Sequence, residues 1–333
     1  MLLEVEKLNI YFKSDRSPEP IHAVRDLSFS LKQGEMLGVV GESGSGKSIT
    51  NLALMGILAD SAIVKAQKAK LNDVDLLNLS EKEWQKIRGQ EVSMIFQDPM
   101  TALNPFLSVE FQMVETIRAH LKLSKKDAVD KSIELLSLVG IPSPKDRLKA
   151  YPFELSGGMA QRVMIAMAIS TNPKLLIADE PTTALDVTIQ KQILNLIKML
   201  QEKNNMSVIL VTHDLGVVSE YSERLQVMYA GEIVESGTTS DLILHPHHPY
   251  THALLASRPG AMVDKLKRIP KTPLPSISGI VPAFHQRPMG CQFHPRCEFA
   301  STECKQSPIA IEAMEPRHRE YRCIHPISAG AIR

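Results

Sequence analysis

The sequence lacks several features that would place it in a class at once. It contains no apolar run of about 18 or more residues, and its first residues mix charge with apolar side chains instead of forming a leader. Its net charge of +1 excludes the broad basic field of a nucleic-acid-binding protein. These absences predict a cytoplasmic protein that, if it works at a membrane, binds other chains there.

Cysteine is also missing from most of the chain. All 4 cysteines lie near the C-terminus, at Cys291, Cys297, Cys304 and Cys323. Without a secretory leader, such clustering favours metal ligation over disulfide bonds. Intervals of five, six and eighteen residues fit neither a CxxC zinc site nor a ferredoxin pattern. On the residues alone, the four cysteines could form a metal site or remain free thiols.

Strand and helix patterns alternate before residue 245. We expect two antiparallel strands at 2–12 and 21–31, later strands at 36–40, 90–96, 175–178 and 207–212, and helices at 49–58, 109–121, 125–139 and 187–202. This order predicts an α/β fold with a mostly parallel core sheet, an antiparallel β subdomain and an inserted helical subdomain at about 98–165. Prolines become frequent after 245, which predicts a domain at 1–245 and a C-terminal extension at 246–333.

A glycine-rich loop follows the strand at 36–40 and precedes a helix. Its sequence has the form GxxxxGKS, in which backbone N–H groups turn inward on phosphates. Lys47 is expected to reach the β- and γ-phosphates, and the Ser48 hydroxyl is a candidate Mg²⁺ ligand. The expected phosphate-binding residues are Gly41, Glu42, Ser43, Gly44, Ser45, Gly46, Lys47, Ser48 and Ile49.

Polar residues stand at the ends of three further strands. Asp179 is placed to hold Mg²⁺, and Glu180 to act as a general base toward water, although an acid pair also caps strand ends. Gln97 and His213 end two other strands, and taken alone they fit a solvated loop residue and a structural histidine.

The segment Leu155-Ser-Gly-Gly-Met159 lies between the glycine loop and Asp179. This order of motifs resembles the ATP-binding subunits of ATP-binding-cassette (ABC) transporters. The resemblance implies that Gln97 senses the γ-phosphate or Mg²⁺ and that His213 contacts the γ-phosphate. It also implies that Phe12 stacks on adenine, with Tyr11 as the alternative.

The resemblance assigns Ser156, Gly157 and Gly158 to ATP that is held by the loop of another subunit. On residues alone, they form a helix N-cap with glycines that permit close packing, and both interpretations are compatible. The loop Ala184-Leu185-Asp186 is implied to cross the dimer interface. Because each motif occurs once, two such subunits must pair head to tail around two ATP molecules.

Met159 and the tail narrow the resemblance to the dipeptide and oligopeptide permease family, and within it to the dipeptide branch of Gram-negative bacteria. The matching tail segments lie at 248–255, 273–282 and 290–297. Relatives in this family imply a [4Fe–4S] cluster on the four cysteines, with zinc as the lesser possibility. Nickel and glutathione importers share the outline. An ABC ATPase of translation or DNA repair is a different-class alternative, which one nucleotide domain and balanced charge disfavour.

The family implies a set of partners. These are a second ATP-binding subunit, expected to be a different chain, two integral membrane permease subunits and a periplasmic peptide-binding protein, with no nucleic acid. The expected reaction is hydrolysis of ATP to ADP and phosphate. The expected location is the cytoplasmic face of the bacterial inner membrane, through the permease subunits.

Overall fold

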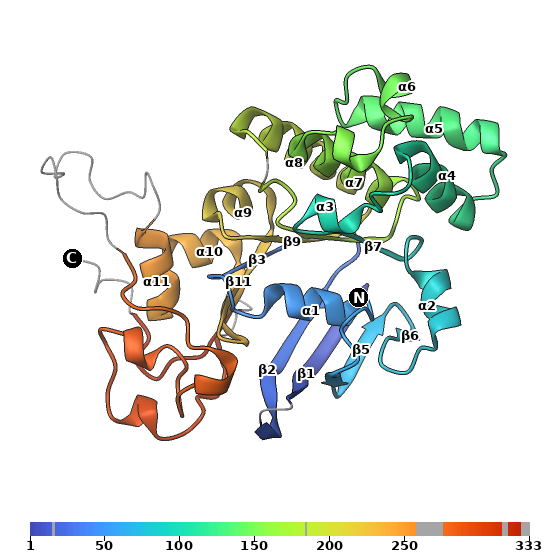
Figure 1. Cartoon of the computed structure of the whole chain (residues 1–333). Helices are drawn as coiled ribbons and strands as arrows, with labels where there is room; N and C mark the ends of the chain where they lie inside the picture. Colours follow the sequence, from blue (N-terminus) through green and yellow to red (C-terminus); the bar gives the residue numbers. More distant parts are fainter. Residues whose placement is uncertain (15–16, 184, 258–275, 315–318, 328–333) are drawn as a thin grey trace, which may run out of the picture.

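The structure is a computed structural model that describes residues 1–14, 17–183, 185–257, 276–314 and 319–327. Figure 1 shows an antiparallel layer near the N-terminus, a central sheet, a group of helices above it and the C-terminal part of the chain to one side. Within the described ranges, no helix is both long and apolar enough to cross a membrane.

The antiparallel sheet is built from the first third of the chain. Its strands are β1 (Leu3–Ser14), β2 (Ser17–Leu31), β4 (Ala62–Lys65), β5 (Lys68–Leu71) and β6 (Val74–Asp75). They run in the order β2-β1-β5-β6, with β4 paired to β1. The two strands expected at 2–12 and 21–31 are therefore present, and they pair antiparallel.

The central sheet has eight strands. They are β3 (Met36–Val40), β7 (Val92–Ile95), β8 (Leu175–Asp179), β9 (Ser207–Thr212), β10 (Arg224–Tyr229), β11 (Glu232–Thr238), β12 (Glu312–Met314) and β13 (Arg319–Tyr321). The order is β12-β13-β11-β10-β3-β9-β8-β7, and the five strands from β10 to β7 are parallel. Both faces of these parallel strands are buried, as their continuous apolar sequences require. The predicted fold class is confirmed.

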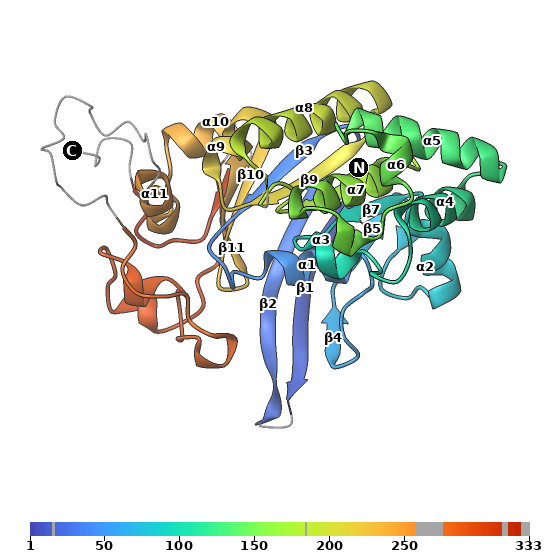
Figure 2. The same cartoon turned by 45° about the horizontal axis from the view of Figure 1, so that its top comes forward.

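Eleven α-helices complete the described parts of the chain. They are α1 (Lys47–Leu54), α2 (Glu81–Ile87), α3 (Pro99–Ala102), α4 (Val109–His120), α5 (Lys125–Leu138), α6 (Pro144–Arg147), α7 (Gly157–Ile169), α8 (Val187–Asn204), α9 (Leu215–Tyr221), α10 (Thr239–Leu244) and α11 (Pro249–Ala256). Helices α4, α5 and α7 group together above the sheet (Figures 1 and 2). Serines cap α4, α5 and α7, because each hydroxyl accepts a hydrogen bond from a first-turn N–H that has no partner inside the helix.

Two apolar clusters hold these layers together. One lies between the central sheet and α5, α7 and α8, and includes Val163, Leu176 and Ile197. The other lies between the central and antiparallel sheets and includes Leu3, Leu37 and Leu54. Helix α1 is therefore held between the two sheets, which fixes the glycine loop at its start (Figure 2).

The C-terminal extension, here the described residues from 246 to 327, is joined to the central sheet. Strand β13 pairs with β11 at Glu235 and Ser236, and β12 pairs with β13. Helix α11 packs near β11. Long-range strand pairing supplies hydrogen bonds to these segments that no local pattern in the sequence predicts.

Candidate functional site

The predicted site residues gather at one edge of the central sheet. The glycine loop follows β3, Gln97 follows β7, Glu180 follows β8 and His213 follows β9. Parallel strands bring their carboxyl ends to the same edge, where ligands of open α/β sheets bind. The fold therefore brings together residues that are far apart in the sequence.

The glycine loop has the backbone that a phosphate cradle needs. Gly44 and Gly46 have φ of 80° and 98°, which side chains other than glycine rarely adopt. A Cβ added at Gly44 would meet nothing within 4 Å, so the inside of the loop is open there. Lys47 bends over the loop and donates to the carbonyls of Gly41 at 2.7 Å and Glu42 at 3.0 Å.

Charges around the loop are balanced between Lys47 and two carboxylates. Burial lowers the pKa of Lys47, and Glu180 and Asp179 oppose that shift through their negative charge. Burial raises the pKa of Asp179, and the Glu180 charge raises it further, while Ser48 and Lys47 act in the opposite direction. A cation at this place would therefore stabilise charged Asp179.

ATP and magnesium fit this edge of the sheet. Oδ1 of Asp179 is buried and has no hydrogen-bond partner among the described residues, which leaves an acceptor for a bound ion. Ser48, the other expected ligand, lies beside it and hydrogen-bonds to that carboxyl group. Hard oxygen ligands of this kind suit Mg²⁺.

Glu180 is held in a strained and well-supported position. Its φ is 49°, a left-handed value that is costly for a residue other than glycine, and such strain gathers at functional sites. Its carboxylate accepts from Gln97 Nε2 at 3.4 Å and lies 3.4 Å from His213 Nδ1. The Thr183 hydroxyl donates to it at 3.0 Å. The three predicted catalytic residues thus meet at one carboxylate.

The glycine-containing signature forms the start of α7. Ser156 caps this helix by accepting from the Met159 N–H at 3.3 Å, and Ser156 and Gly157 are exposed. This exposed N-terminus suits phosphate binding from outside the chain. Met159 stands where the LSGGQ signature of ABC transporters has glutamine. It packs against the core cluster under α7, so its side chain has an apolar role.

Phe12 and Tyr11 lie on opposite faces of β1, because side chains alternate along a strand. Tyr11 stacks on His22 with ring centroids 4.1 Å apart. Phe12 packs against the core on the same face of β1 as Ile10. Ile10 pairs with Val24 on β2, and a Cβ added to Gly46 of the glycine loop would lie 3.5 Å from the Val24 side chain. Phe12 is thus on the loop side.

Leu185 and Asp186 precede α8, and Asp186 caps it, but Ala184 lies outside the described residues.

Comparison with known proteins gives the family. The description "ABC transporter" matches residues 24–183, and "Oligopeptide/dipeptide transporter, C-terminal region" matches residues 234–304. The "Dipeptide transport ATP-binding protein DppD" of Haemophilus influenzae is 50% identical over 98% of this chain and 96% of its own. The chain belongs to the ATP-binding subunits of dipeptide and oligopeptide ABC transporters.

Two further members extend the likeness across bacteria. The DppD protein of Escherichia coli (strain K12) is 48% identical over 98% of this chain and 97% of its own. The "Oligopeptide transport ATP-binding protein AppD" of Bacillus subtilis is 51% identical over 91% of this chain and 90% of its own. A solved dimer of the ATP-binding cassette MJ0796, in a post-hydrolysis state with ADP and Pi, has a TM-score of 0.64 at 26% identity, covering 71% of this chain and 98% of that one.

The prediction of an iron–sulfur cluster for this family member is wrong. Among the described residues, no group of three or more His, Cys, Asp or Glu side chains is placed to hold a metal ion, and the four cysteines are free thiols. They line a small apolar pocket together with Phe293, Phe299 and Ile309. Burial raises the pKa of Cys291 to about 11 and that of Cys323 to about 12. Zinc is excluded among these residues by the same observation.

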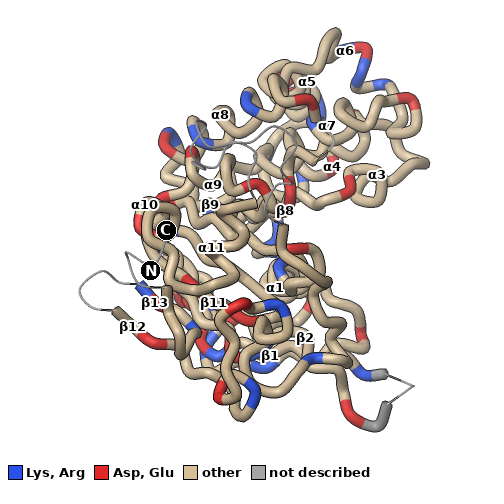
Figure 3. Tube along the Cα trace, turned by 90° about the vertical axis from the view of Figure 1, so that its left-hand side faces the viewer, with Lys and Arg blue, Asp and Glu red and all other residues tan. Residues whose placement is uncertain are grey.

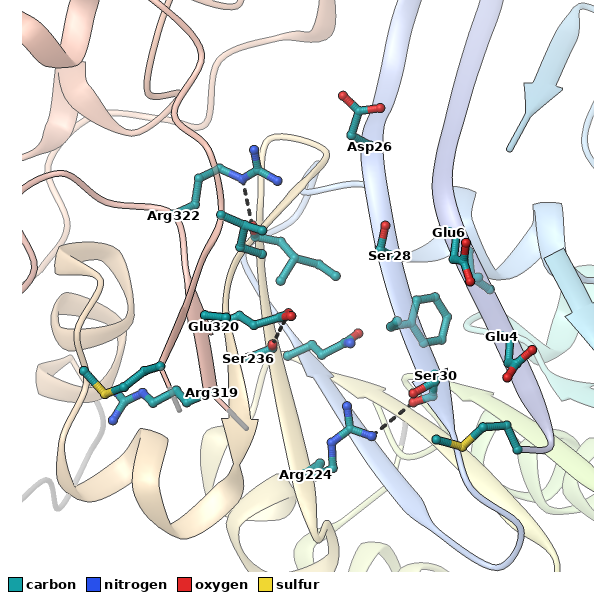
Figure 4. Close-up of a pocket in the computed structure, with 18 residues that line it drawn as sticks. Glu4, Glu6, Asp26, Ser28, Ser30, Arg224, Ser236, Arg319, Glu320 and Arg322 are labelled. Atoms are coloured by element: carbon teal, nitrogen blue, oxygen red, sulfur yellow. Dashed lines mark hydrogen bonds between the residues drawn. The ribbon is translucent and has the colours of Figure 1, made fainter. Parts of the chain in front are cut away.

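A separate cavity of about 480 Å³ lies between β2 and the edge formed by β11 and β13 (Figure 4). None of the predicted site residues of this ABC subunit lines it. Two of its cationic groups already have partners: Arg224 donates to Ser30 O at 3.1 Å, and Arg322 donates to Ile233 O at 3.2 Å. We therefore place the functional site at the glycine loop and not in this cavity.

Four residues at the site of this ABC subunit were not predicted from the sequence. Thr183 supports Glu180, and the buried Gln161 donates to Pro181 O at 2.5 Å, just after Glu180. Tyr250 and Arg296 contact Glu42 of the glycine loop. Thr183 stands three residues after Glu180, a spacing at which a hydroxyl reaches back along a turn, so it had a local signal. The other three contacts are long-range.

Proposed function

We propose that this chain is the ATP-hydrolysing subunit of a bacterial importer of dipeptides or oligopeptides. It converts ATP and water to ADP and phosphate. The observation that carries this assignment is the meeting of Gln97 and His213 at the Glu180 carboxylate, beside the open glycine loop. The likeness to peptide-transport ATP-binding proteins supports peptide as the cargo over nickel or glutathione.

In this proposal, each group at the sheet edge has a separate task. Backbone N–H groups of the loop from Gly41 to Ile49, apart from the Glu42 N–H that donates to Tyr250, bind the phosphates together with the Lys47 ammonium, and Phe12 stacks on adenine. Ser48, Asp179 and Gln97 hold Mg²⁺, which neutralises phosphate charge. Glu180 accepts a proton from the attacking water, and His213 orients toward the γ-phosphate.

The proposed working unit is a pair of cassettes. Ser156, Gly157 and Gly158 at the exposed start of α7 bind ATP held by the partner's loop, so a lone subunit hydrolyses ATP poorly. The solved dimer of the MJ0796 cassette supports this arrangement. We propose that the second cassette here is a different chain.

The helical group carries a surface suited to the two permease subunits. Phe106 is 86% exposed and Phe153 is 67% exposed, and Phe153 stacks on Tyr151 with centroids 5.6 Å apart. An open groove beside α4 is lined by Phe111 and Val114. Exposed aromatic residues favour a protein partner. The complex would lie at the cytoplasmic face of the inner membrane and receive peptide from a periplasmic binding protein.

A non-transport role in translation or DNA repair has less support. In the view of Figure 3, basic and acidic residues are interspersed along the chain and form no basic stripe. The net charge of +1 agrees with this distribution.

The test is reconstitution with the permease subunits, the partner cassette and the binding protein in lipid vesicles. We expect dipeptide to stimulate ATP hydrolysis. It should accumulate in the lumen of vesicles that hold the cassettes and ATP inside and the binding protein outside. Phe106→Ser with Phe153→Ser should reduce recovery of permease subunits while ATP binding persists. Recovery of ribosomes or DNA in place of membrane subunits would overturn the proposal.

A further inference from the structure

We propose that Tyr250 and Arg296 of the C-terminal extension are positioning residues of the ATP site, which act by holding Glu42 of the glycine loop. The inference rests on the proposed function of that loop in binding ATP. It makes the C-terminal extension an internal part of the nucleotide site and not only an appended region.

The contacts to Glu42 come from two places in the extension. The Tyr250 hydroxyl accepts a hydrogen bond from the Glu42 backbone N–H at 2.9 Å. The Arg296 guanidinium binds both oxygens of the Glu42 carboxylate, with Nη1 to Oε1 and Nη2 to Oε2 each at 3.1 Å. A two-point contact between arginine and carboxylate fixes direction as well as distance.

Every polar group of Glu42 therefore has a hydrogen-bond or ion-pair partner. Tyr250 holds its N–H, Lys47 donates to its carbonyl, and Arg296 holds its carboxylate. The carboxylate is turned toward the extension and neutralised there. Released from Arg296, it would add a negative charge beside a loop that has to bind a polyphosphate, and like charges at such short range repel.

Both holding residues are themselves fixed before any ligand binds. Tyr250 is fully buried among Tyr229 and Phe293, with ring centroids 4.7 Å and 5.3 Å away. The Arg296 side chain is 6% exposed, and its Nε donates to Ser278 O at 2.7 Å. Groups locked by their own neighbours can position a third group, because little freedom is lost when the contact forms.

Arg287 of the extension lies near a second contact of the loop. Arg287 donates to His22 O at 2.8 Å and to Ala23 O at 2.7 Å on β2. The adjacent turn residue Gly231 donates to Ser45 O of the loop at 2.8 Å. Of these contacts of the extension, only those of Tyr250 and Arg296 reach the glycine loop directly.

The experiment uses the assembled transporter and the purified full chain. Tyr250→Phe removes one hydroxyl and keeps the ring, and we expect the KM for ATP to rise roughly 3-fold to 10-fold with little change in kcat. Arg296→Met should raise it about 10-fold. Tyr321→Phe is the matched control, because its hydroxyl bonds Glu312 away from the loop.

The decisive variant combines Arg296→Met with Glu42→Gln. If Arg296 acts by holding and neutralising Glu42, removing the charge restores most of the ATP affinity that Arg296→Met loses. A packing role for Arg296 would not be rescued in this way. Equilibrium binding of ATP and thermal unfolding without nucleotide are measured on the parent chain, on Arg296→Met, on Glu42→Gln and on their combination. A loss of folding is thereby separated from a loss of ATP affinity.

Lys47→Ala separates this inference from the proposed function. If Lys47→Ala binds ATP normally, the role of the loop itself is wrong. If Lys47→Ala loses ATP binding while Tyr250→Phe and the Arg296 variants keep normal KM values, the positioning role alone is overturned. An Arg296→Met variant too unstable to purify leaves Tyr250→Phe, which must still raise KM.

Discussion

Arg319 on β13 forms an ion pair with Glu235 on β11, and both side chains are completely buried, with 0% exposure. Glu235 also accepts from the backbone N–H groups of His247 and His248, at 2.7 Å and 3.0 Å. One carboxylate therefore ties the last described strand, the start of α11 and the central sheet together. The C-terminal extension depends on this pair for its position.

We expect Arg319→Met to destabilise the chain by about 3–5 kcal/mol, because it leaves the Glu235 charge buried without its cation. Denaturant unfolding without nucleotide measures this loss. Lys149→Met, at an exposed position, is the control and should change the free energy of unfolding little. A loss as small as that of the control would mean that Glu235 is neutral or satisfied by the backbone alone.

Glu180→Gln should slow ATP hydrolysis in the assembled transporter by about 10²-fold to 10⁴-fold, because an amide cannot accept the proton of the attacking water. ATP should remain bound between paired cassettes, which gel filtration with labelled ATP detects. The exposed Glu220→Gln, whose partner is Lys191, serves as control. Hydrolysis at the normal rate in Glu180→Gln would assign the base to another residue.

Acid should weaken the folded chain through His248. Burial, together with a smaller contribution from the Arg322 charge, lowers its pKa from 6.5 to about 3. Its Nδ1 accepts from the Tyr250 N–H at 3.0 Å, so protonation would also cost this contact. Between pH 6.5 and about 3, the unfolded chain binds a proton that the folded chain excludes, so the free energy of unfolding falls as the pH falls.

The expected loss is about 2 kcal/mol between pH 6.5 and pH 5, measured by denaturant unfolding. His248→Asn keeps an acceptor for the helix start without titrating, so its profile should be flatter over this range. His245→Asn, at an exposed position, should follow the parent chain. Parallel profiles for His248→Asn and the parent would show that another group carries the acid sensitivity.

Gly231→Ala should destabilise the chain more than Gly44→Ala, although both glycines have positive φ, at 82° and 80°. A Cβ at Gly231 would collide with the carbonyl of Ala23, whereas one at Gly44 meets nothing within 4 Å. We expect about 1–2 kcal/mol of backbone strain at Gly44, and a larger loss at Gly231 because the turn must also move. Thermal unfolding without nucleotide compares the two, and equal losses would mean that the turn at Gly231 yields freely.

Local pattern was enough for much of this protein. The loop from Gly41 to Ser48 was predictable because its strand, glycines and helix are neighbours in sequence. The strand ends at Gln97, Asp179 and His213 followed from apolar runs. No strand or helix was predicted from the sequence at residues 59–89, although they form β4, β5, β6 and α2. Those strands are short, and what stabilises them is pairing with β1 and with one another.

The sequence by itself determined the family, the phosphate loop and the sheet that presents it, because each depends on residues within a few positions of one another. Tertiary structure decided the rest. The contacts of Tyr250 and Arg296 with Glu42 span 208 and 254 positions, and no periodicity encodes a partner at that distance. It also placed the four cysteines around one apolar pocket, where burial raises the pKa of Cys291 and Cys323.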